Sequence, residues 1–336
     1  MGRLYWIDFS RGLAFLTVIY SHIVQQMSDP LLMPFFRPFF LCVFFFVSGY
    51  LFKDRDKFIV VIEQRTRTIM FPFLLLGCAM ILLSQLYSYN PIPVGLGESF
   101  KELLLQDDYK HAHINSMWFL PTLYICSILF FFIIKFSHNS LKRLFVLSFL
   151  LYSVNWLYIW LFKFPPLPYA VHYVGFGCFY MSLGLCYKEN EDKFDKYINK
   201  SLIILSICVY VIYITIMKVD YNFDGSMYFI DAIMLSSLGL LVVTYISKKC
   251  RSHFIEFVGA NTLLYFAIHA KVLALIQRVI YSLVGFPSVS MLGGGIVILV
   301  TLLVASVLVV PALFVNKYLP WVLGKNFKMW YEKKPI

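Results

Sequence analysis

Two residues that could do chemistry lie on one face of the first hydrophobic segment. Arg11 and His22 are eleven residues apart in RGLAFLTVIYSH, and eleven residues at 100° each bring an α-helix back to within about 20° of its starting direction. Asp8, three residues before Arg11, falls within about 60° of the same direction. One stripe therefore carries an acid, a guanidinium and an imidazole. Ionisable groups inside a membrane helix are expected to be functional, because their insertion is costly.

The composition places most of the chain in a lipid bilayer. Of its 336 residues, 60% are hydrophobic and 14% are charged, and the mean hydropathy is +0.75, whereas a soluble domain carries about 25% charged residues. Such a chain must span the membrane as helices, which satisfy their own backbone hydrogen bonds. We therefore predict an all-α, polytopic integral membrane protein with the lipid bilayer as a partner.

The positive charge is distributed as a topology signal. The net charge is +11, but the Lys and Arg residues lie in short loops between apolar runs and form no basic patch on one face, so we expect no nucleic-acid partner. The seven cysteines are scattered without a CxxC pair, which is typical of small buried side chains. We accordingly expect no metal site.

Ten apolar segments divide the chain, each close to the roughly 20 residues needed to span a bilayer. They cover residues 7–27, 35–52, 68–88, 117–135, 142–161, 169–187, 200–218, 226–247, 258–281 and 290–315. Lys and Arg are concentrated after every second segment and at the C-terminus, so the positive-inside rule places both termini in the cytoplasm. The longest external loop is 89–116, and we interpret residues 1–336 as a single membrane domain.

This topology predicts a cytoplasmic level of polar groups. Asp8 and Arg11 lie near the cytoplasmic end of the first segment, Ser48 near that of the second, and Arg65 and Arg67 at the start of the third. Three guanidiniums at one level could bind a phosphorylated ligand, because their planar forks match phosphate oxygens. The alternatives are that Arg65 and Arg67 are topology anchors and that Arg11 only pairs with Asp8.

A second level of polar groups is predicted deeper in the membrane. His22 lies about 16 Å further out than Arg11 along the helix, and His269 lies near the midplane of the ninth segment. The alternative for His269 is ordinary packing. Asn155 and His172 are placed in the outer halves of their segments, and Asn115 and Trp118 at the outer start of the fourth segment.

Five stretches of the sequence resemble the motifs of acyltransferase family 3 membrane proteins. They are YWIDFSRGLAFLTVIYSH at 5–22, FFFVSGYLFK at 44–53, RTRTIMFPF at 65–73, MWFLPTLY at 117–124 and TLLYFAIHA at 262–270. The hallmark of that family, an Arg and a His separated by ten residues in the first helix, is matched by Arg11 and His22. The chain looks most similar to the branch of fucose 4-O-acetylases and surface-polysaccharide O-acetyltransferases. Ser10-Arg11 departs from the Lys-Gly that is frequent in that branch.

The resemblance implies a ten-helix enzyme, in a bacterial inner membrane, that moves an acetyl group from cytoplasmic acetyl-CoA to a sugar hydroxyl of a surface or lipid-linked glycan. His22 would be the general base or become transiently acylated. Asp8 would orient Arg11, and His269 would position the acceptor or stabilise the oxyanion. The donor residues would be Arg11, Ser48, Arg65 and Arg67, and the acceptor residues Asn115, Trp118, Asn155 and His172.

The main alternative from another class is a secondary transporter or flippase for a sugar-containing substrate. It would use the same ionisable groups as a transport path, and it predicts broken helices at paired positions. Gly293–Gly295 is one candidate break, and the first half of the chain has no counterpart. A non-enzymatic scaffold would leave the costly pair Arg11 and His22 unexplained.

Overall fold

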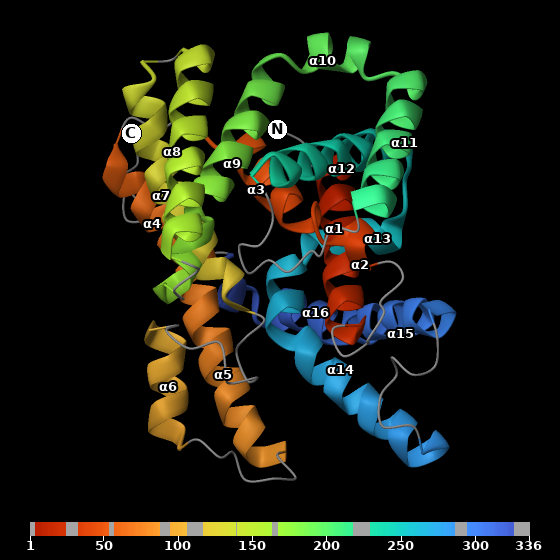
Figure 1. Cartoon of the computed structure of the whole chain (residues 1–336). Helices are drawn as coiled ribbons and strands as arrows, with labels where there is room; N and C mark the ends of the chain where they lie inside the picture. The colour runs from red at the N-terminus through yellow and green to blue at the C-terminus, as the bar shows by residue number, and fades with distance from the viewer. Residues whose placement is uncertain are drawn as a thin grey trace.

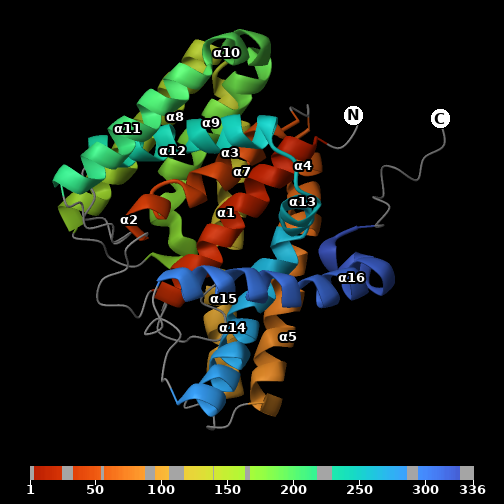
Figure 2. The ribbon, with the colours of Figure 1, turned by 90° about the vertical axis from the view of Figure 1, so that its right-hand side faces the viewer.

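The computed structural model describes residues 4–24, 33–53, 57–87, 95–105, 117–138, 140–162, 167–217, 229–285 and 294–325. All regular secondary structure in these ranges is helical (Figures 1 and 2). In chain order the elements are α1 (Tyr5–Val24), α2 (Met33–Phe36), α3 (Phe40–Tyr50), α4 (Phe58–Arg65), η1 (Thr66–Met70), α5 (Phe71–Tyr87), α6 (Leu96–Leu105), α7 (Phe119–Phe136), α8 (Leu141–Phe162), η3 (Pro168–Tyr173), α9 (Val174–Glu189), α10 (Glu191–Tyr197), α11 (Lys200–Met217), α12 (Phe229–Lys249), α13 (His253–Ala260), α14 (Thr262–Val284), α15 (Gly294–Val307), α16 (Val309–Tyr318) and η5 (Pro320–Leu323).

The predicted all-α, polytopic class is confirmed. Within the described ranges, seven helical stretches are long and apolar enough to cross a membrane, and an eighth is added if α10 and α11, bent by 74°, form one span. All ten predicted segments overlap helix. Two fall short of a span because α3 has 11 residues and α9 has 16. Pro38 precedes α3 and Pro168 precedes α9, and proline interrupts the helical hydrogen-bond ladder.

Helix α1 is the central element of the fold. It is the most enclosed of the candidate spans, with 78% of its apolar window buried, and it contacts α3, α12, α13, α14 and α15 (Figure 1). Its contact with α13 is close because both helices place a glycine at the crossing. A Cβ on Gly12 would overlap the carbonyl oxygen of Ile255, and a Cβ on Gly259 would overlap that of Asp8. Small residues let membrane helices approach to backbone contact.

A second glycine-mediated contact holds the short helix α3 against α9. A Cβ on Gly49 would overlap the backbone of Met181, and a Cβ on Gly184 would overlap the carbonyl oxygen of Phe46. This packing buries every residue of α3. The short helix is therefore stabilised by its neighbours rather than by its own length, which is the usual situation for helices of this size.

The third predicted segment begins earlier than expected, so the placement of two arginines at its start was wrong. Helix α4 begins at Phe58 and continues through a π-helical turn, η1, into α5, which makes one 27-residue candidate span, Phe58–Ser84. Arg65 and Arg67 thus lie inside a continuous helix. Pro72 follows the π-helical turn, and the wider turn accommodates a ring that would otherwise clash with the preceding carbonyl.

The predicted external loop 89–116 contains a helix, α6. It packs along α5, where Leu103 fills the space above Gly77. Its C-terminal end is tied to η3 because the Tyr169 hydroxyl donates to the Leu104 carbonyl. Leu103 is buried whereas Leu104 and Leu105 are exposed. The apolar spacing of LGESFKELLL gives this helix one buried face.

The α1–α13 crossing predicts a strong effect of a single methyl group. Gly12→Ala should lower the free energy of unfolding by about 2 kcal/mol or more, because the new Cβ meets a backbone oxygen that cannot rotate away. Thermal unfolding of the detergent-purified protein measures this. Gly295→Ala is the matched control, since nothing lies within 4 Å of a Cβ there. Equal midpoints for Gly12→Ala and the wild type would contradict the packing.

Candidate active site

Two histidines that are far apart in the sequence, His22 of α1 and His269 of α14, lie in contact between these helices. The ring centroids of His22 and His269 are 5.1 Å apart, with their planes at 48°. His269 is fully buried, and its ring forms a T-shaped contact with Phe15 at 5.3 Å between centroids. His22 is half-buried. The structure therefore brings together two residues that were predicted as catalytic without any expectation that they touch.

The hydrogen bonds of His269 define which of its nitrogens carries the proton. Nδ1 lies 2.9 Å from the carbonyl oxygen of Tyr265 and 3.2 Å from that of Phe266. Carbonyl oxygens only accept, so Nδ1 is the protonated nitrogen of the neutral ring. Nε2 is then a bare acceptor, and it is buried with no hydrogen-bond partner among the described residues. A buried acceptor without a partner is rare enough to suggest a catalytic use or a ligand.

Arg11 and His22 remain partly accessible on a helix that is otherwise mostly buried. Both residues lie on the same face of the unbroken helix α1, about 16 Å apart along its axis. Asp8 is only 8% exposed and interacts electrostatically with Arg11. The carbonyl of Asp8 also packs on Gly259, so the α1–α13 crossing lies at the level of this charged pair.

The other three predicted donor residues lie near the end of α3 and in the α4–η1 helix. The guanidinium of Arg65 lies 5.2 Å from the centroid of the Phe52 ring, just beyond the end of α3. The backbone of Arg67 packs against Gly324. Ser48 is buried, and its hydroxyl donates to the Phe44 carbonyl at 2.7 Å. This bond within α3 already uses the proton that Ser48 could offer to a ligand.

The predicted acceptor residues divide into an aromatic group and a helix cap. Trp118 contacts Tyr173 at 5.1 Å between centroids, and the buried His172 contacts Tyr173 at 4.3 Å. Asn155 instead accepts a hydrogen bond from the Gly175 N–H at 2.8 Å, and it thereby satisfies an otherwise unpaired donor in the first turn of α9. Asn115 lies outside the described residues.

The aromatic group is connected to the histidine pair by ring contacts. Trp118 contacts Phe119 at 6.3 Å, Phe119 stacks on Phe266 at 5.4 Å, and Phe266 meets His269 at 6.5 Å, all between centroids. The start of α7 thus reaches the part of α14 that carries His269. Residues at the start of α7 and the histidine pair therefore belong to one packed region.

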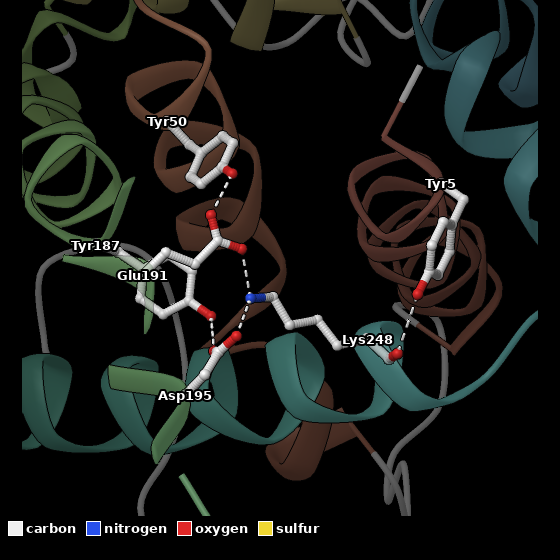
Figure 3. A network of polar contacts seen from close by, with 6 residues as sticks. All are labelled: Tyr5, Tyr50, Tyr187, Glu191, Asp195 and Lys248. Atoms are coloured by element: carbon white, nitrogen blue, oxygen red, sulfur yellow. Dashed lines mark hydrogen bonds and ion pairs between the residues drawn. The ribbon is translucent and has the colours of Figure 1, made fainter. Parts of the chain in front are cut away.

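A charged network that the sequence analysis missed joins α10 and α12 (Figure 3). The Lys248 ammonium donates to Glu191 at 2.5 Å and to Asp195 at 2.7 Å. Its side chain is 18% exposed and also lies 5.2 Å from the Trp6 ring centroid. The sequence contains the signal, a lysine at a segment end and four acidic residues in the loop 188–199, but the lysine alone indicates only a topology marker.

Tyrosine hydroxyls extend the network to three further elements (Figure 3). Tyr50 of α3 donates to Glu191 at 2.5 Å, and Tyr187 of α9 donates to Asp195 at 2.6 Å. Tyr5 of α1 donates to the Lys248 carbonyl at 3.3 Å. The ends of α1, α3, α9 and α12 are thereby fixed to one another around α10.

Lys271 is a second residue that the sequence analysis overlooked. It lies two residues beyond His269, and its ammonium donates to the Ser84 hydroxyl at 2.7 Å. This bond joins α14 to α5 on the face of α14 turned away from His269, because two residues correspond to about 200° of helix. A lysine inside the segment 258–281 was a visible signal.

The fold and the site define a polytopic helical membrane protein whose central helix carries an arginine and one member of a histidine pair. The acyltransferase domain family matches residues 4–315, and the chain belongs to this family. It is therefore a membrane acyltransferase. No curated protein and no solved structure gives a match to the chain.

The network around Lys248 predicts a measurable contribution to stability. Lys248→Met should lower the free energy of unfolding by about 2 kcal/mol, because it leaves two neighbouring carboxylates without their shared cation. The thermal midpoint in detergent measures this, with Lys249→Met as the control because Lys249 is exposed. Adding Glu191→Gln and Asp195→Asn should restore part of the loss. A triple variant less stable than Lys248→Met alone would contradict the electrostatic explanation.

Proposed function

We propose that the protein is an O-acetyltransferase that moves an acetyl group from cytoplasmic acetyl-CoA to a sugar hydroxyl of a surface or lipid-linked glycan. The observation that carries this proposal is the contact of His22 with His269, at 5.1 Å between ring centroids. An imidazole is suited to acid–base work near neutral pH. The membrane in question would be the inner membrane of a bacterium, with both termini in the cytoplasm.

In the proposed reaction His22 is the general base. It removes the proton of the acceptor hydroxyl while that oxygen forms a bond to the acetyl carbon. The carbon–sulfur bond of the thioester then breaks, and the CoA sulfur leaves with the electron pair and takes the proton from His22. The products are an acetyl ester and CoA, and no further reactant is needed.

His269 would support His22 as a proton acceptor. Its Nδ1–H is engaged by the Tyr265 and Phe266 carbonyls, so the neutral ring has no second N–H to offer an oxyanion. Its Nε2 can accept a hydrogen bond from His22 and stabilise the imidazolium that forms when His22 takes the proton. This is the role that a carboxylate plays behind the histidine of hydrolase triads. This role behind His22 differs from both roles predicted from the sequence, which were positioning of the sugar acceptor and stabilisation of the oxyanion.

Arg11 would bind the phosphates of acetyl-CoA, with Asp8 orienting its guanidinium, and Arg65 and Arg67 would add to the donor site. A planar guanidinium suits phosphate because it donates two parallel N–H hydrogen bonds to the phosphate oxygens. Support comes from Asp8, which acts electrostatically on Arg11. The spacing on α1 would then join the donor level to the acetyl-transfer level over about 16 Å of one helix.

Transfer of labelled acetyl groups tests the proposal. Purified protein in liposomes is incubated with acetyl-labelled acetyl-CoA and bacterial glycans, and label in the glycan is counted. His22→Ala should reduce the rate by about 100-fold or more, and His269→Ala should reduce it as well, because general-base catalysis contributes at least this much. His138→Ala is the control, since His138 is an exposed histidine. Equal rates for His22→Ala and wild type would refute the assignment. Solute uptake without transfer would favour the transporter.

A labelling experiment without acceptor distinguishes the two possible roles of His22, general base and transiently acylated residue. With labelled acetyl-CoA and no glycan, the general-base route predicts no label on denatured protein. A histidine that is transiently acylated would hold up to one acetyl group per chain. Stoichiometric label that disappears in His22→Ala and passes to added glycan would overturn the general-base assignment while leaving the acetyl-transfer function intact.

A further inference from the structure

A pocket lined by none of the residues assigned to the proposed reaction lies between the start of α1 and helix α13. Its volume is about 380 Å³, within the range of ligand sites, and it is lined by Tyr5, Arg251, His253, Glu256 and Phe257. Tyr5 precedes His22 by 17 residues, or about 26 Å of helix. The pocket is therefore a place for the remote part of a long ligand rather than for the reacting group.

The walls of the pocket hold a guanidinium in a fixed orientation. The Arg251 guanidinium carbon lies 3.8 Å from the centroid of the Tyr5 ring, and Nε of Arg251 pairs with Glu256 at 2.9 Å. Among the described residues its two terminal nitrogens have no hydrogen-bond partner. A guanidinium positioned by one carboxylate and one ring can present those nitrogens to a phosphate with a smaller loss of side-chain freedom than an arginine without such contacts.

Further positive groups lie beside Arg251. The short stretch 248–253 reads KKCRSH, and within it Lys249 and His253 are exposed like Arg251. Lys248 is engaged by Glu191 and so is committed to the network described above. The pocket lining thus holds Arg251 and His253, and the exposed Lys249 lies two residues away in the sequence; this positive charge attracts a ligand with several negative charges.

We propose that this pocket binds the phosphorylated adenosine end of the acyl-CoA donor. The inference rests on the proposed function and extends it to the donor's recognition. Arg251, with His253, contacts the phosphate on the adenosine ribose, whereas Arg11 further along α1 contacts the pyrophosphate of the same donor. The adenine lies against Phe257 and the Tyr5–Arg251 stack, and the Glu256 carboxylate accepts a hydrogen bond from its exocyclic amine. Bases stack on aromatic rings and on guanidinium planes.

The aromatic wall favours a nucleotide over an anionic lipid headgroup. An anionic lipid headgroup would be satisfied by the basic side chains alone, and it has no flat ring to stack on Phe257 inside the pocket. The position of the pocket beside Tyr5, at the start of α1, also fits a CoA ligand. One rigid helix supplies Tyr5 at the adenosine end, Arg11 further along and His22 at the thioester end.

Direct binding tests the pocket independently of catalysis. The full-length protein in detergent is titrated calorimetrically with adenosine 3′,5′-bisphosphate. Arg251→Ala should weaken binding by about tenfold or more, as expected for the loss of a charged contact to phosphate, and Arg143→Ala should leave it unchanged because Arg143 is an exposed arginine on α8. Equal affinity of Arg251→Ala and wild type would overturn the proposal. So would Arg251-dependent binding of phosphatidylglycerol vesicles in the absence of bisphosphate binding, which would assign the pocket to a lipid.

Steady-state kinetics separate this inference from the proposed function. Arg251→Ala should raise the KM for acetyl-CoA by about tenfold or more with little change in kcat, and it should not affect acetyl-pantetheine, which lacks the nucleotide. Unchanged kinetics with both donors would overturn the pocket while the acetyltransferase remains. Bisphosphate binding that requires Arg251 in a protein that transfers no acetyl group would support the pocket and refute the function.

Discussion

The backbone contact between α1 and α13 is the constraint on which the rest of the structure depends. Gly12 and Gly259 let the two helices approach until carbonyl oxygens occupy the space of the missing Cβ atoms. No lipid or side chain can enter such a crossing, so the rotation of α1 about its axis is fixed. That rotation decides where the stripe of Asp8, Arg11 and His22 points. Helix α14 follows α13 after one residue, so the same contact places His269 opposite His22.

The two histidines have unequal surroundings, and this inequality gives them different roles. His269 is fully buried and bound by backbone carbonyls of its own helix, so its ring and tautomer are fixed before any substrate arrives. His22 is half-buried and can be reached by a substrate. A rigid acceptor behind an accessible base is a preorganised arrangement, which lowers the reorganisation needed at the moment of proton transfer. The network around Lys248 fixes the other end of α1 through Tyr5, next to the pocket at Arg251.

Periodicity along one helix was predictable from the sequence, and contacts between helices were not. The stripe of Arg11 and His22 follows from 3.6 residues per turn, and α1 has no internal break. The contact of His22 with His269 depends on the crossing of helices far apart in sequence. Arg65 and Arg67 were misplaced because the apolar run before them was short and the π-helical turn near Pro72 leaves no hydropathy signal. Asn155 stays a predicted site residue, and its hydrogen bond to the first turn of α9 could not be predicted, because a polar side chain in a membrane segment does not reveal which neighbouring helix it contacts.

The central claim is that His22 and His269 act as one unit in acetyl transfer, and a double-mutant cycle on the transfer rate tests it most directly. The rates of wild type, His22→Ala, His269→Ala and the double variant are compared with acetyl-CoA and a glycan acceptor. If His269 acts only through His22, the double variant should be no slower than His22→Ala, since residues that act as a unit are non-additive. Losses that multiply in the double variant would show two independent contributions and contradict the account.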